Sequence, residues 1–428
     1  MPDPSSLTSL KPKFRRDVLW NMGSLGVLGL TGIVINAVVV AWRDSETLGV
    51  FNQVFAAYII LSQMSVGGVH ASVLRHVALH QTDRRRCAQI TTAGLLLVTV
   101  LSLLVSALAL ASRDALGRLL DSPDVATGLA YAVPGLVFFS LNKVLRSALN
   151  GLRAMRAVAV FEAGRYGLLL ASVLLILSLD WPGSRLPAAL TLAEGVLFVA
   201  MIGYVATRQF RLQLGPEPMT RLVEHLSFGF RGGLAGILSA MNTRVDVLLL
   251  GGFCDDATVG LYSFAAILAE GLGQIPSVVR RNLDPILGAC FARDERERIR
   301  AMAQQIRRVF YPIMGAIGVA VVLGYPLMAT LLASDLSVPV SWAVFAILVA
   351  GIVASSGYRP FFGILLQAGR PGTHTLFIAC MVASNIVLNL IFISLLSVHG
   401  AAAATALVFV LEAVCMVLLA RRLLGVRL

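Results

Sequence analysis

The chain alternates long apolar stretches with short polar ones, and its second half repeats the order of its first half. Residues 48–53 (LGVFNQ) recur as residues 259–264 (VGLYSF) at an offset of 211. Residues 192–196 (LAEGV) recur as residues 410–414 (VLEAV) at an offset of 218. Both offsets are close to half of the 428 residues. Matches at nearly one offset indicate a duplicated set of helices, as is found in membrane transporters.

The apolar stretches have the length that a membrane requires. A helix needs about 20 apolar residues to cross a hydrocarbon core about 30 Å thick, whereas barrel strands alternate over about ten. Hydrophobic residues make up 57% of the chain and charged residues 14%, which excludes an ordinary soluble domain. We predict about twelve spans, at 18–41, 48–71, 89–111, 125–149, 158–178, 186–207, 225–252, 258–282, 309–332, 338–367, 374–396 and 400–420. The predicted fold class is an all-α polytopic membrane protein, with two six-helix repeats around a central cavity.

Basic residues predict the orientation of these spans. If the N-terminus is cytoplasmic, the cytoplasmic segments hold 25 of the 35 Lys and Arg residues and the external loops hold 4. Because basic loops stay on the cytoplasmic side, both termini are expected there. The net charge of +12 then reflects contact with the anionic inner leaflet of the bilayer and does not indicate nucleic-acid binding.

The repeat also predicts how the chain is divided. We expect a cytoplasmic arm at 1–17, six-helix bundles at 18–207 and 225–420, a cytoplasmic linker at 208–224 and a tail at 421–428. No metal site or cofactor is expected, because the five Cys residues include no C-x-x-C pair and no nucleotide-binding G-x-x-x-x-G-K-[ST] motif occurs. The external loops are too short to carry an enzyme domain.

Polar side chains form a stripe on equivalent spans of the two halves. Since ionisable groups are costly in lipid, they should face a cavity, a partner or the interface. At 100° per residue, one face of the eighth span holds Ser263, Glu270, Gln274, Ser277 and Arg281. The second span carries Asn52, Gln63 and His70. Two equivalent polar faces predict a shared cavity; the alternative is hydrogen bonding in a dry helix interface.

Charged residues within the spans supply candidates for binding and for coupling to an ion gradient. The ligand-binding candidates are Arg231, Arg359, Arg146, Asn242, Gln63, Gln274 and Arg281. The ion-coupling candidates are Asp246, Glu270, Glu412 and Glu194.

Spacing supports several of these candidates and leaves alternatives for others. Arg231, Asn242 and Asp246 share one helical face of the seventh span, whereas Arg244 is expected to point away from it. Snorkelling to the interface is the alternative for Arg231. Glu194 and Glu412 have no basic residue three or four positions away. Pairing with an arginine across the cavity is the alternative for Glu270.

Three segments resemble a known family: residues 45–68, residues 244–270 (RVDVLLLGGFCDDATVGLYSFAAILAE) and residues 385–413. They are similar to the polysaccharide flippases of the multidrug/oligosaccharidyl-lipid/polysaccharide exporter superfamily, and the resemblance covers nearly the whole chain. One departure is His399, where that family's pattern suggests a Pro-containing turn slightly earlier. The resemblance implies a MATE-like fold in the bacterial cytoplasmic (inner) membrane. It also implies a flippase that moves a polyprenyl-diphosphate-linked oligosaccharide outward by alternating access, for O-antigen or exopolysaccharide synthesis.

A cation-coupled multidrug antiporter of the same superfamily is the alternative function. Such an antiporter favours an acidic, aromatic lining, whereas the spans hold six basic residues against five acidic ones. A diphosphate, by contrast, is well matched to the forked donors of arginine. Since no nucleotide site is present, transport is expected to draw on a proton or sodium gradient or on consumption of the lipid-linked product outside. A polysaccharide polymerase or ligase would be the partner that consumes the exported product.

Overall fold

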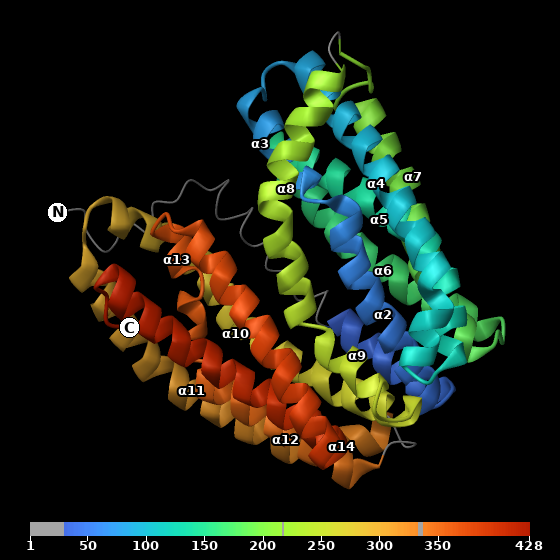
Figure 1. Cartoon of the computed structure of the whole chain (residues 1–428), viewed down its shortest axis with the longest axis vertical. Helices are drawn as coiled ribbons and strands as arrows, with labels where there is room; N and C mark the ends of the chain where they lie inside the picture. The colour runs from blue at the N-terminus through green and yellow to red at the C-terminus, as the bar shows by residue number, and fades with distance from the viewer. Residues whose placement is uncertain (1–29, 216–217, 333–336) are drawn as a thin grey trace. The chain divides into compact units, whose positions relative to one another are not determined.

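The computed structural model describes residues 30–215, 218–332 and 337–428. Within these ranges every regular element is a helix (Figure 1). The predicted arm at 1–17 lies outside the described residues. The all-α prediction is confirmed.

The helices of the first half follow one another with short connections. They are the segment Leu30–Trp42, α2 (Ser45–Val66), α3 (Val69–Leu79), α4 (Arg84–Leu119), α5 (Pro123–Gly151), α6 (Met155–Ser178), the short η2 (Gly183–Arg185) and α7 (Ala188–Arg208). The second half contains α8 (Pro218–Asn242), α9 (Val245–Gly251), α10 (Asp256–Ala292), α11 (Arg296–Leu332), α12 (Val338–Ser355), η3 (Arg359–Phe361), α13 (Ile364–Gln367) and α14 (Pro371–Leu424).

The described helices account for the twelve predicted spans. Nine are long and apolar enough to cross a membrane, and the bent pair Gly233–Asn242 and Val245–Gly251 provides a tenth crossing. One of the nine, α14, has 54 residues and non-helical backbone at Ser397, so it comprises two successive helices. The shorter apolar helix Leu30–Trp42 is the described part of the first predicted span.

Three predicted spans are interrupted where the backbone departs from a helix. Gly67 and Gly68 both have positive φ and separate α2 from α3 inside the predicted span 48–71. Glycine takes this conformation without the steric cost of a side chain. The seventh span bends by 52° between α8 and α9. The tenth is divided into α12, η3 and α13, with Pro360 in the break. A single unbroken helix is therefore the wrong description of the second and seventh spans, whereas the tenth is interrupted where its proline predicts a kink.

The chain forms two compact units. The first runs to Ile35 and includes Leu61–Ser112 and Leu129–Gly236; the second comprises Asn36–Ile60, Arg113–Gly128 and Ile237–Leu428. The second unit thus includes the beginnings of α2 and α5, the end of α8 and everything that follows α8 in the chain. The predicted division into bundles at 18–207 and 225–420 stays a prediction.

Each unit has a buried apolar core and an apolar outer surface. Val73 and Leu145 are fully buried in the first core, and Leu287 and Met416 are fully buried in the second. Large side chains such as Leu323 on α11 remain 72% exposed. An apolar surface on long apolar helices is what a lipid-facing wall requires, because the hydrocarbon is as apolar as leucine.

Candidate functional site

The second unit contains a cavity of 530 Å³ between α8, α9, α10, α12, α13 and α14. Seven acidic or basic side chains line it: Arg244, Asp246, Glu270, Arg280, Asp284, Arg359 and Glu412. Asn242 and Gln274, both predicted from the sequence, line the same cavity. Membrane-embedded charge of this density marks a functional site, because its desolvation is costly.

The break between α8 and α9 brings alternate residues of the seventh span to one place. α8 ends at Asn242 and α9 begins at Val245, so Arg244 occupies the junction and not a helical position. As a result, Asn242, Arg244 and Asp246 all line the cavity. The expectation that Arg244 points away from the other two was wrong because it assumed a continuous helix.

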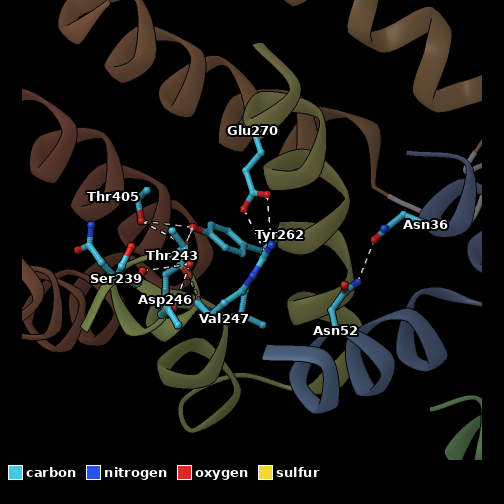
Figure 2. A network of polar contacts seen from close by, with 12 residues as sticks. Asn36, Asn52, Ser239, Thr243, Asp246, Val247, Tyr262, Glu270 and Thr405 are labelled. Atoms are coloured by element: carbon cyan, nitrogen blue, oxygen red, sulfur yellow. Dashed lines mark hydrogen bonds and ion pairs between the residues drawn. The ribbon is translucent and has the colours of Figure 1, made fainter. Parts of the chain in front are cut away.

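Arg244 and Glu270 form an ion pair across the cavity. The Arg244 nitrogens Nη1 and Nη2 donate to the two Glu270 carboxylate oxygens at 3.1 and 3.4 Å (Figure 2). The same guanidinium lies 5.6 Å from the ring centroid of Phe55 on α2. Pairing with an arginine, which was the alternative for Glu270, is therefore the observed arrangement. Because two charge-assisted hydrogen bonds already hold this carboxylate, we assign Glu270 a structural role and not a role in ion coupling.

Asp246 is held by neutral donors. The Tyr262 hydroxyl donates to Oδ2 at 2.5 Å and the Thr405 hydroxyl to the same oxygen at 3.4 Å (Figure 2). Oδ1 accepts from the backbone N–H of Val247 at 2.9 Å. Asp246 is 8% exposed, and within the described part of the chain no ion pair includes it. A buried carboxylate without a cation is a place where a cation or a proton is stabilised.

Glu412 lies in a similar environment. Its Oε1 accepts from Nδ2 of Asn242 at 2.8 Å, and the Asn242 carbonyl accepts from Asn385 at 3.1 Å. Glu412 is 7% exposed. Asn242 therefore orients this carboxylate from the end of α8 and is itself fixed by α14.

Two arginines line the cavity without a carboxylate partner. Among the described residues, neither Arg280 nor Arg359 has a carboxylate oxygen within 4.0 Å. Arg359 begins η3, and its guanidinium carbon lies 4.3 Å from the ring centroid of Phe409. This contact with the aromatic face holds the planar cation and leaves its N–H groups available.

Arg281, predicted as a ligand residue, does not line the cavity. Its side chain is exposed, and the preceding Arg280 takes its place. The α10 positions that line the cavity recur at 266, 270, 273, 277, 280 and 284, which is seven residues for two turns. Such a repeat drifts by about 20° per heptad from an ideal helical face. Arg281 is one position further along α10, about 100° around the helix from Arg280, and its side chain is directed away from this face.

The predicted residues Arg146 and Glu194 line a closed cluster in the first unit, and Gln63 contacts this cluster through Lys143. The cluster surrounds only about 10 Å³ of free space. Gln63 Oε1 accepts from Lys143 at 2.7 Å. Arg146 is paired with Glu162 at 2.6 Å. Gln63 and Arg146 thus have resident partners in this structure.

Glu194 belongs to the same closed cluster. It is 3% exposed, is paired with Arg165 of α6 and accepts from Asn142 Nδ2 at 2.9 Å. No basic residue lies three or four positions from Glu194 on its own helix, and its cation comes from the separate helix α6. This pairing makes Glu194 the least available of the four predicted coupling residues.

Several other sequence candidates lie elsewhere. The side chain of Arg231 is outside the described residues, and only its helical backbone in α8 is known. Asn52 donates to Asn36 at 2.9 Å (Figure 2), and Ser263 is buried on α10 with no hydrogen-bond partner among the described residues. Arg280 was missed by the sequence argument, although it is adjacent to the residue that was chosen.

Solved transporters have the same fold. An inward-facing multidrug resistance transporter of the MATE family, in the MOP superfamily, gives a TM-score of 0.78 at 16% identity, over 92% of this chain and 94% of that chain. The lipid II flippase MurJ in an inward closed conformation gives 0.74 at 11% identity, over 94% and 87% of the two chains. A MOP superfamily transporter from Pyrococcus furiosus, described as having a binding pocket of reverse polarity, gives 0.65 at 15% identity, over 95% and 94%. The chain therefore has the MATE-like fold of multi-pass membrane transporters.

Sequence comparison is more specific. The family described as polysaccharide biosynthesis protein matches residues 14–279. This match covers more than half of the chain, and the protein belongs to that family. No curated protein sequence matches it.

Proposed function

We propose that this protein is a flippase that moves a polyprenyl-diphosphate-linked oligosaccharide from the inner to the outer leaflet of the bacterial cytoplasmic membrane by alternating access. It would serve O-antigen or exopolysaccharide synthesis, upstream of a polysaccharide polymerase or ligase. Membership in a polysaccharide biosynthesis family and the transporter fold support this assignment.

The observation that carries the proposal is the pair Arg280 and Arg359. Both line one cavity, and neither is neutralised by a described carboxylate within 4.0 Å. A diphosphate offers several anionic oxygens, and each guanidinium offers parallel N–H donors that fit them. Half-buried arginines that have no ion pair at contact distance can bind a ligand that supplies an anion.

The rest of the cavity suits an amphiphile. Besides the polar residues of α10, the lining includes Leu348 and Ile352 of α12 and Phe377 of α14. A charged face beside an apolar one can hold the junction between a phosphate headgroup and the first isoprene units of a lipid. The rest of the tail can stay in the bilayer, so no enclosed apolar pocket is needed.

Coupling to a proton or sodium gradient is assigned to Asp246 and Glu412. These two carboxylates are buried and held by neutral donors, whereas Glu270 and Glu194 are in ion pairs. A carboxylate that has no ion pair at contact distance gains most from binding a cation. Asp246 and Glu412 would therefore bind the coupling ion on one side of the membrane and release it on the other.

Export of cationic drugs is the second candidate function. It is favoured by the four carboxylates of the same cavity, Asp246, Glu270, Asp284 and Glu412, which together offset the three arginines. It also fits the likeness to a multidrug resistance transporter. In this reading the arginines would be internal counter-ions and the ligand would be a cation.

Deletion of the gene in its own host distinguishes the two candidates. A flippase predicts loss of surface polysaccharide and accumulation of the lipid-linked unit in the inner leaflet, with unchanged sensitivity to cationic dyes. A drug exporter predicts the reverse pattern, with normal polysaccharide and a lowered inhibitory dye concentration. Complementation with the wild-type chain and with an Arg359→Ala chain tests whether either phenotype depends on the cavity.

A further inference from the structure

Near their N-termini, the helices α2 and α10 cross with their backbones in direct contact and no side chain between them. A Cβ on Gly49 would overlap the carbonyl oxygen of Asp256, and a Cβ on Gly260 would overlap the carbonyl oxygen of Ser45. The two contacts are related by the repeat, since each pair of positions is separated by 211 residues. Small residues permit such close backbone approach between membrane helices. The crossing is therefore a two-fold contact between the halves, and it lies within the second unit.

One carboxylate fastens this crossing. Asp256 Oδ1 accepts from Gln53 Nε2 of α2 at 2.5 Å, and Oδ2 accepts from the Ser122 hydroxyl at 2.6 Å. Ser122 directly precedes α5, so the Asp256 side chain joins α10 to α2 and to the beginning of α5. Both donors are buried, with Gln53 0% and Ser122 2% exposed. We call these three residues the Asp256 clamp.

The carboxylate of the clamp has no counterpart in the first half, although the crossing is symmetric. The residue equivalent to Asp256 in the first half is Ser45, which carries no charge. Among the described residues, no cation lies within ion-pair distance of Asp256, and the residue itself is only partly buried. A carboxylate held only by neutral donors can exchange them for water at modest cost, unlike a buried ion pair. The two hydrogen bonds of the clamp can therefore break and re-form more easily than a buried ion pair.

The orientation predicted from the basic loops puts this end of α2 and α10 on the external side of the membrane. We propose that the Asp256 clamp is the external latch of the transporter, and that both of its hydrogen bonds must break before the cavity opens to the outside. The inference rests on the proposed transport function, but it does not depend on the substrate. It predicts that weakening the clamp increases access from outside to the buried face of α10.

A cysteine reporter measures this access. Ser263 lies seven residues beyond Asp256 on α10, is 5% exposed and is replaced by Cys in a chain that lacks Cys87, Cys254, Cys290, Cys380 and Cys415. A membrane-impermeant maleimide is added outside intact cells and its reaction rate is followed. Asp256→Asn removes the charge of the acceptor and should raise the rate on the order of ten- to a hundredfold, the equivalent of one charge-assisted hydrogen bond.

Two further variants keep the experiment decisive. Ser122→Ala removes one hydroxyl and should raise the rate in the same direction by a smaller factor, even if Asp256→Asn folds poorly. Asp255→Ser is the matched control, because Asp255 caps α10 through the Thr258 N–H at 2.8 Å and serine can preserve that cap. Unchanged rates in both clamp variants, or an equal increase in the control, would overturn the latch. Because no substrate enters the assay, this failure would leave the proposed substrate untouched.

Discussion

Replacement of Arg359 by alanine should weaken binding of a phosphate-bearing lipid more than any other single change in the cavity. The side chain is held against Phe409 at 4.3 Å and has no described carboxylate within 4.0 Å, so its donors are free for a ligand. A hydrogen bond to a charged group contributes about 1.5–3 kcal/mol. Loss of the guanidinium should therefore lower the affinity by about 10- to 100-fold. Arg359→Lys keeps the charge but loses the planar fork, and its loss should be intermediate.

The assay is calorimetric titration of the detergent-solubilised protein with farnesyl diphosphate, a short soluble analogue of the lipid carrier. Arg281→Ala is the control, because Arg281 is on the same helix as Arg280 but is exposed and outside the cavity lining. Wild-type affinity in Arg359→Ala would refute the reasoning. An equal loss in Arg281→Ala would show that the effect is general surface charge and not a site.

Three other predictions test separate features. A cysteine at Ser277, which lines the cavity, should react with a small water-soluble thiol reagent at least tenfold faster than a cysteine at Gln63 beside the closed cluster; similar rates would contradict the contrast between the two sites. Glu412→Gln should abolish the response of transport to an imposed pH or sodium gradient in vesicles while leaving ligand binding intact, and a retained response would remove Glu412 from coupling. Hydrogen bonds from the hydroxyl and the N–H of Thr258 lower the pKa of Asp255. The cap therefore stabilises the fold at pH values above the pKa of Asp255 in the unfolded chain. This stabilisation is lost as the pH falls through the pKa of Asp255 in the folded chain. Asp255→Asn should remove that part of the acid dependence of thermal unfolding, and an unchanged profile would contradict it.

The helical fold could be predicted from the length of the apolar stretches and from their repetition along the chain. A stretch of about 20 apolar residues has few alternatives in a membrane, since every backbone group must be bonded within the helix. The repeat at an offset of 211 was visible in the sequence and reappears as the paired contacts of Gly49 and Gly260. The helix breaks were harder to predict, because glycine and proline occur both inside spans and at their interruptions.

The site was predicted only where a residue's own helix determined its direction. Asn242, Asp246, Gln274 and Arg359 line the cavity as expected. Arg244 was assigned to the wrong side because a 52° bend replaced the assumed straight helix.

Tertiary partners account for the other differences. Glu194 has no basic neighbour along α7, yet Arg165 reaches it from α6. Nothing in the spacing of a single helix encodes such a partner. Gln63 and Arg146 were correctly recognised as polar residues within spans, but the sequence did not show that Lys143 and Glu162 would bond to them.

Flipping by the purified protein in proteoliposomes tests the central claim most directly. A fluorescent oligosaccharide on polyprenyl diphosphate is placed in both leaflets, and an enzyme added outside modifies only the exposed headgroups. The proposed function predicts that the wild-type protein delivers the inner pool to the enzyme within minutes, that Arg359→Ala slows this delivery by at least tenfold, and that Arg281→Ala does not. Delivery no faster than in protein-free vesicles, together with gradient-driven uptake of a cationic dye, would contradict the account and identify a drug exporter.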